Sequence, residues 1–124
     1  MPASDNTAGP YRPIVRAGNL LFVSGQIGLD KNAVLRDGFI GQFRQAMSNL
    51  ESVLASEEVT LRDVVKTTVF LIDPTYFDEM NSLYQSYFSV QPPSRSCVTV
   101  SALPKDALVE IEAVACLPQS NLSV

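Results

Sequence analysis

Apolar residues recur along the chain with two different periods, and the first half predicts one strand followed by one helix. Residues 19–27 are dense in apolar and β-forming side chains, which predicts a strand buried on both faces or nearly so. Further on, the apolar spacing becomes 3, 4, 3, 4, which predicts a helix of about four turns. Its apolar stripe consists of Ile40, Phe43, Met47, Leu50 and Leu54, and polar residues such as Gln42 lie mostly off it.

The middle of the chain repeats this order of strand and helix. Residues 64–72 are rich in β-branched side chains and predict a second central strand. Asp73 and Pro74 follow as a helix N-cap and a first-turn proline. Apolar residues then recur from Phe77 at spacings of 3, 4 and 3 or 4, which predicts a second amphipathic helix that ends near Phe88.

The last third predicts two more strands, 95–102 and 107–116, and the short segment between them suits a hairpin. This order of elements predicts an α+β domain with both helices on one face of a mixed sheet. In the last strand Glu110 and Glu112 alternate with apolar residues, so the uncovered face carries two carboxylates among apolar side chains. Such a face usually has a partner, and we expect subunits to associate there.

No linker, repeat or charge run divides the chain, so the sequence predicts a single domain over 1–124. Residues 1–8 are expected to be a flexible lead and 119–124 a polar tail. Because no segment reads as a secretory signal or a membrane span, we expect a soluble cytoplasmic protein, with an organelle left open. Cys97 and Cys116 form no CxxC or metal-ligand pattern, so we expect reduced thiols and no metal site.

Composition narrows the chemistry that remains. The 124 residues include no histidine, which excludes a Ser-His-Asp triad, a Cys-His pair and a histidine zinc site. Nine Lys and Arg stand against 13 Asp and Glu, and the net charge of −4 disfavours a nucleic-acid partner. Catalysis must therefore use other side chains, backbone groups and water.

One group of residues could carry such chemistry. Antiparallel pairing across the expected hairpin places Thr99 near Glu110 and Cys97 near Glu112, with Arg95 on the same face. The group is either a cross-strand salt bridge on a solvated face or a carboxylate-binding arginine beside a glutamate that holds or deprotonates water. Charge pattern alone favours the salt bridge.

Six segments spread over residues 9–117 form a specific combination. They are Gly9-Pro10-Tyr11, Val23-Ser24-Gly25-Gln26-Ile27, Val64-Val65-Lys66-Thr67-Thr68-Val69-Phe70, Met80-Asn81, Pro93-Ser94-Arg95-Ser96-Cys97-Val98 and Leu103-Pro104-Lys105-Asp106-Ala107-Leu108-Val109-Glu110-Ile111-Glu112-Ala113-Val114-Ala115. In this order they closely resemble the YjgF/RidA family of enamine/imine deaminases, which is also known as L-PSP endoribonuclease.

The resemblance implies a fold, an assembly and an activity. The fold would be a chorismate-mutase-like (bacillus type) α+β subunit, with two helices on one face of a mixed six-stranded sheet. The assembly would be a homotrimer with clefts between subunits. The activity would be hydrolytic deamination of 2-aminoacrylate and related enamine/imine intermediates to 2-oxo acids and ammonium, without a cofactor.

The resemblance also assigns roles to residues. Arg95 matches the arginine that grips the substrate carboxylate, and Glu110 matches the acid that orients the attacking water. Cys97 matches a strand residue whose backbone faces the substrate. The positions that match the lining of the cleft are Tyr11, Ser24, Gly25 and Asn81.

The chain departs from the family pattern in places, and these departures bear on substrate range. Arg12-Pro13 stands where a small or polar residue and Gln are frequent, and Arg12 could add charge at the cleft mouth. The turn after Asp30 is short, and Ser101-Ala102 replaces the frequent Ala-Arg. Two other functions stay open: a ribonuclease or translation inhibitor, and a non-catalytic regulatory trimer that binds small carboxylates.

Overall fold

The computed structural model describes residues 9–118, which form one five-stranded sheet and two α-helices. The strands are β1 (Ile14–Ala17), β2 (Leu20–Gln26), β3 (Val64–Leu71), β4 (Ser94–Thr99) and β5 (Val109–Cys116). The helices are α1 (Gly38–Ala55) and α2 (Phe77–Tyr87). The expected lead, 1–8, and tail, 119–124, lie outside the described residues.

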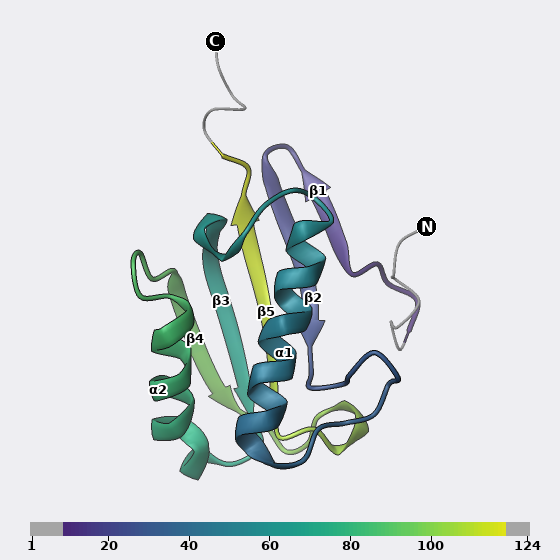
Figure 1. Ribbon diagram of the computed structural model, residues 1–124, viewed down its shortest axis with the longest axis vertical. Coiled ribbons are helices and arrows are strands. Elements are labelled where there is room, and N and C mark those ends of the chain that lie inside the picture. Colours follow the sequence, from purple (N-terminus) through teal and green to yellow (C-terminus); the bar gives the residue numbers. More distant parts are fainter. Residues whose placement is uncertain (1–8, 119–124) are drawn as a thin grey trace.

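The strand order is β1-β2-β5-β3-β4 (Figure 1). β4 pairs with β3 in parallel, and the other pairs are antiparallel. The expected hairpin is therefore wrong, because β3 lies between β4 and β5. A strand that follows a helix can return parallel to the strand before it, and α2 is the crossover that makes β3 and β4 parallel. The α+β class and the mixed sheet are confirmed.

The expectation of six strands is also wrong, since the sheet has five. Between β2 and α1 the chain makes only one isolated bridge, between Leu29 and Leu35. The turn between them is held by the Asp30 carboxylate, which accepts hydrogen bonds from the backbone N–H groups of Asn32 and Val34. These bonds raise the stability of the charged form, so the pKa of Asp30 lies below its usual value.

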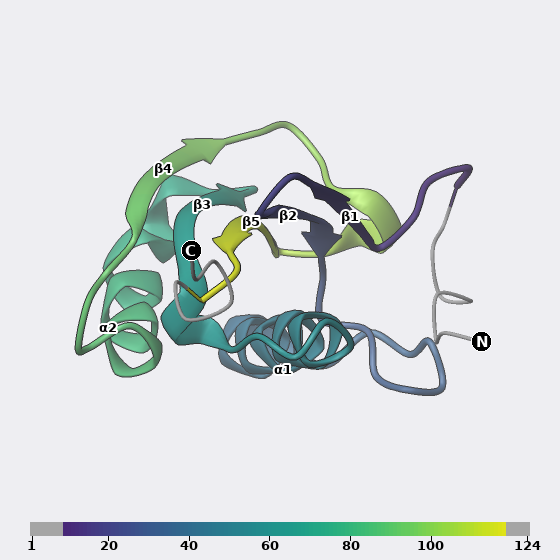
Figure 2. The ribbon, with the colours of Figure 1, turned by 90° about the horizontal axis from the view of Figure 1, so that it is seen from above.

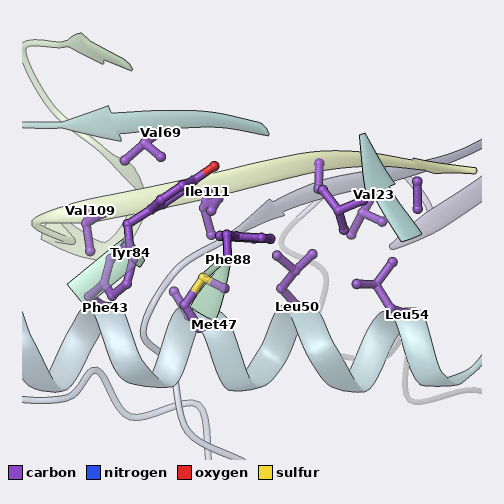
Figure 3. Close-up of a cluster of buried hydrophobic side chains, with 14 of the residues drawn as sticks. Val23, Phe43, Met47, Leu50, Leu54, Val69, Tyr84, Phe88, Val109 and Ile111 are labelled. Atoms are coloured by element: carbon purple, nitrogen blue, oxygen red, sulfur yellow. The ribbon is translucent and has the colours of Figure 1, made fainter. Parts of the chain in front are cut away.

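Both helices cover the same face of the sheet, as expected, and the other face carries no element of the described chain (Figure 2). The core lies between the helices and the covered face, where side chains of α1 meet those of β2, β3 and β5 (Figure 3). β5 alternates as its sequence predicts, with Val109 and Ile111 buried in this core. Among residues 9–118, neither helix is both long enough and apolar enough to cross a membrane.

The stripe of α1 differs from the predicted one at its first turn. Phe39 is 5% exposed and lies in the core, whereas Ile40 is 46% exposed. Gln42, expected on the solvent side, is buried. Its side-chain amide donates to the carbonyl oxygen of Arg36 and accepts from the backbone N–H of Leu108. These two hydrogen bonds satisfy the polar group that burial removes from water.

β2 is covered on one face only, contrary to the prediction from its apolar run. Leu21 and Val23 are buried under α1, while Phe22 between them is 45% exposed on the open face. Phe22 therefore adds a large apolar side chain to the uncovered face of the sheet. Cys97 and Cys116 are free thiols, as expected.

Candidate active site

Arg95 lies on the covered face of the sheet, at the edge where α2 packs against β4. Its guanidinium carbon is 4.8 Å from the centre of the Tyr84 ring and 5.9 Å from that of Phe77. Nη1 also contacts the Met80 sulfur at 3.8 Å, a weak acceptor. Within residues 9–118 no carboxylate pairs with this guanidinium, which leaves its planar fork of donors for a ligand.

The Tyr84 ring that supports Arg95 is itself fixed by β3. The Tyr84 hydroxyl and Thr67 Oγ1 are 2.6 Å apart, and both side chains are buried. Figure 3 shows the Tyr84 side chain among the buried side chains between α1 and the strands. Burial raises the pKa of Tyr84, so the phenol stays neutral and can share this hydrogen bond. The arginine therefore rests on a rigid ring.

Asn81 belongs to the same surface. It follows Phe77 by four residues and precedes Tyr84 by three on α2, so it shares a helix face with the two rings that flank Arg95. Its side chain is partly buried. Asn81 thus lies on the same face of α2 as the two rings beside Arg95.

Cys97 follows Arg95 by two residues on β4 and is partly buried. Burial raises the pKa of its thiol, and the nearby Arg95 charge only partly opposes this, so the thiol is protonated at neutral pH. The backbone N–H of Val100 bonds the Leu71 carbonyl oxygen on β3 (2.8 Å). Successive strand residues direct their N–H and C=O groups to alternate sides of the strand. Cys97 is three residues before Val100, so its N–H and C=O point away from β3, to the free edge of β4.

Glu110 lies on the opposite, open face of the sheet. It pairs in register with Phe70 of β3, whereas Arg95 pairs with Thr67, so the two charged residues differ in both face and position along the strands. Burial raises the pKa of the Glu110 carboxyl, and the neighbouring Glu112 charge raises it further. A carboxyl of this kind can take up a proton nearer neutral pH than an ordinary glutamate.

Ser24 and Gly25 form an irregularity in β2 that makes room for Glu110. The register slips between Val23 and Gln26, so these two residues face one residue of β5. Ser24 is held by its hydroxyl, which donates to the Arg12 carbonyl oxygen at 2.7 Å. A Cβ added at Gly25 would overlap the Glu110 carboxylate, so only glycine allows the carboxylate this position.

A hollow of about 410 Å³ opens beside these residues on the uncovered face. Its floor is apolar and comes from β1, β2 and β5, and its polar lining consists of Tyr11, Arg12, Ser24, Lys66, Thr68 and Glu112. Lys66 Nζ donates to Thr68 Oγ1 at 3.1 Å. Among residues 9–118, no cluster of three or more acidic or cysteine side chains could hold a metal ion.

The predicted constellation is thus wrong in its arrangement. Arg95, Cys97 and Thr99 do not share a face with Glu110 and Glu112, because β3 separates the two strands and the register places the groups on opposite faces. The cross-strand salt bridge fails for the same reason. The candidate residues instead divide between the two faces: Arg95 and Cys97 lie on the covered face of β4, under α2, which carries Asn81, whereas Tyr11, Ser24, Gly25 and Glu110 lie on the open face.

Sequence reasoning missed two residues that shape the arginine group, Thr67 and Tyr84. Both lie at positions that read as core. The available signal was chemical: a threonine and a tyrosine hydroxyl at buried positions each need a hydrogen-bond partner. Neither Lys66 nor Thr68 is among the site residues that the sequence predicts, and both line the hollow.

The contact between Gly25 and Glu110 gives a stability prediction. Gly25→Ala should destabilise the fold by about 1–3 kcal/mol, because the new methyl group must displace the Glu110 carboxylate. In a Glu110→Ala background the same substitution should cost much less. Chemical denaturation of the four proteins measures this coupling.

Gly41→Ala on α1 is the matched control, because a Cβ there would lie 3.6 Å from the Arg36 Cβ, an ordinary contact. It should be neutral or stabilising, since alanine favours helix. An equal loss of stability from Gly25→Ala in both backgrounds would contradict the contact.

Sequence comparisons match the chain to one family model and to individual proteins. The family model described as Endoribonuclease L-PSP matches residues 2–117. A RutC family protein of Pyrococcus horikoshii is 42% identical over 109 residues, which cover 86% of each chain. The 2-iminobutanoate/2-iminopropanoate deaminase of Mus musculus is 38% identical over 109 residues, which cover 86% of this chain and 81% of the mouse protein.

Solved structures agree with these sequence matches. RidA from the Antarctic bacterium Psychrobacter superposes with a TM-score of 0.87 at 36% identity, covering 90% of this chain and 91% of that one. Escherichia coli TdcF with bound serine gives a TM-score of 0.86 at 33% identity, with the same coverage of 90% and 91%.

Proposed function

The chain belongs to the YjgF/RidA family, whose model bears the description Endoribonuclease L-PSP, and from that premise we propose that it hydrolyses 2-imino acids. The substrates are 2-aminoacrylate and related enamine/imine intermediates, and the products are 2-oxo acids and ammonium. Arg95 and Glu110 are the catalytic residues. Tyr11, Ser24, Gly25, Asn81 and Cys97 contact the substrate.

The observation that carries this proposal is the Arg95 guanidinium, which is seated on the Tyr84 ring without a carboxylate partner in residues 9–118. A planar guanidinium matches the two oxygens of a carboxylate, and partial burial strengthens that bond. Two names of relatives support the same ligand class. The mouse relative is named for two 2-imino acids, and the TdcF structure holds serine, which has an α-carboxylate.

Glu110 supplies the second part of the mechanism. Its carboxylate holds a water molecule and takes a proton from it as the water oxygen adds to the C=N carbon. Glu110 returns this proton to the imine nitrogen, which gives the carbinolamine. The carbinolamine hydroxyl proton then passes through the same carboxylate to the amino group, and ammonia leaves as the 2-oxo carbonyl forms. The raised pKa of Glu110 supports its use as a proton acceptor and donor. Binding by Arg95 supplies the orientation that this addition needs.

Two copies of the chain supply the two groups. Arg95 and Glu110 lie on opposite faces of one sheet, so one substrate molecule cannot reach both within a chain. The half-apolar open face and the free edge of β4 are both available to another copy. The assembly is a homotrimer with a cleft between each pair of subunits, where Arg95 of one copy faces Glu110 of the next.

The proposal is tested by an imine-hydrolysis assay. A serine or threonine dehydratase generates 2-aminoacrylate, and pyruvate release is followed with and without this protein. We expect acceleration by the wild type and by Cys97→Ser, because the protonated thiol takes no part in the reaction. No acceleration by the wild type would refute the proposed function.

A further inference from the structure

The hollow on the open face contains two cations, Arg12 and Lys66, that the mechanism above does not use. The hollow adjoins Glu110: Glu112 in its lining is two residues from Glu110 on the same face of β5, and Ser24 in its lining precedes Gly25. A substrate whose reacting carbon lies beside Glu110 can therefore direct its side chain into the hollow.

The residues that line the hollow carry a net positive charge, whereas the whole chain carries a net negative charge. Arg12 and Lys66 are opposed there by Glu112 alone, which leaves one net positive charge, whereas the chain carries −4. Lys66 Nζ bonds the neutral hydroxyl of Thr68 and keeps further donors. No carboxylate within residues 9–118 pairs with either cation.

Hydrogen bonds position the Lys66 side chain and the backbone of Arg12 in the hollow. The Ser24 hydroxyl bonds the Arg12 carbonyl oxygen at 2.7 Å, which fixes the backbone of Arg12 at the rim. The side chain of Lys66 is partly buried and is oriented by Thr68. Phe22 and Val114 give the hollow an apolar part that suits methylene groups. Its volume of about 410 Å³ exceeds what the methyl group of the smallest imino acids requires.

We infer that the hollow is a side-chain subsite for a second carboxylate, and that Arg12 and Lys66 direct the enzyme toward 2-imino dicarboxylates. This inference rests on the proposed function, since it assigns a substrate class to the same site. The α-carboxylate binds Arg95 of one copy, and the distal carboxylate binds Arg12 and Lys66 of the other. The methylene groups between the two carboxylates lie against the apolar floor.

The test compares two imines in one assay. An amino-acid oxidase acting on aspartate and on alanine releases 2-iminosuccinate and 2-iminopropanoate, and formation of oxaloacetate or pyruvate gives kcat/KM for each. The wild type should favour 2-iminosuccinate by about tenfold or more. Arg12→Gln and Lys66→Gln should each reduce this ratio about tenfold, mainly through a higher KM for 2-iminosuccinate. Arg12→Glu should reduce it further, because the charge is reversed.

Arg44→Gln, an exposed arginine on α1, is the matched control and should leave the ratio unchanged. Hydrolysis of both imines with the same ratio in the wild type and the Arg12→Gln/Lys66→Gln protein overturns the subsite and leaves the proposed function standing. If the wild type hydrolyses neither imine, the proposed function itself fails and the subsite with it.

Discussion

Arg95→Ala should lower kcat/KM for 2-aminoacrylate-derived imine hydrolysis about 100-fold, which corresponds to roughly 3 kcal/mol of lost transition-state stabilisation. The loss follows from removal of both hydrogen bonds to the substrate carboxylate. The fold should persist, because the guanidinium makes only ring and sulfur contacts in the described chain. Steady-state kinetics with circular dichroism of the variant measures both effects.

Two matched variants separate binding from a general loss of charge. Arg95→Lys should recover only part of the activity, because an ammonium cannot form the bidentate pair. Arg44→Ala removes an exposed arginine from α1 and should have wild-type kinetics. Full activity in a folded Arg95→Ala protein would remove the arginine from the mechanism.

Glu110→Gln should lower kcat about 100-fold or more with a small change in KM, since glutamine keeps the shape of the side chain but cannot take a proton. The wild-type rate should rise with pH as Glu110 ionises. Because burial and Glu112 raise the pKa of Glu110, the midpoint of that rise should lie above the ordinary glutamate value of 4.5. A pH profile of kcat/KM for both proteins tests this.

Glu112→Gln is the informative control for this profile. It removes the like charge that raises the pKa of Glu110, so the midpoint should move to lower pH. Retention of kcat in Glu110→Gln, or a pH profile that ignores both substitutions, would show that Glu110 does not carry the proton.

Local periodicity predicted the elements well, because burial against one surface leaves a spacing that the sequence displays. The alternation around Glu110 and Glu112 in β5 and the stripe from Phe43 to Leu54 in α1 both appear as expected. The predicted stripe of α1 is wrong by one residue at its start, and the prediction for β4 is wrong in the strand with which it pairs. The prediction starts the stripe at Ile40, whereas the structure buries Phe39. Both side chains are large and apolar, and the spacing fits either residue.

The arrangement of the site depended on strand pairing, which no local pattern encodes. The segment after β4 has a length that suits a hairpin, yet β4 pairs with β3 and β5 pairs with β2 and β3. With this pairing, Arg95 lies on the face of the sheet opposite to the face that carries Glu110. The sequence resemblance proposes roles for both residues, and the register shows that they lie on opposite faces within one chain.

The central claim is that each site takes Arg95 from one copy and Glu110 from another, and mixing two inactive variants tests it directly. Arg95→Ala and Glu110→Gln proteins, unfolded and refolded together in equal amounts, should recover about one quarter of wild-type activity, because random assortment leaves that fraction of clefts with both native residues. Each variant refolded alone should stay inactive. A mixture that assembles and remains inactive would contradict a site shared between copies.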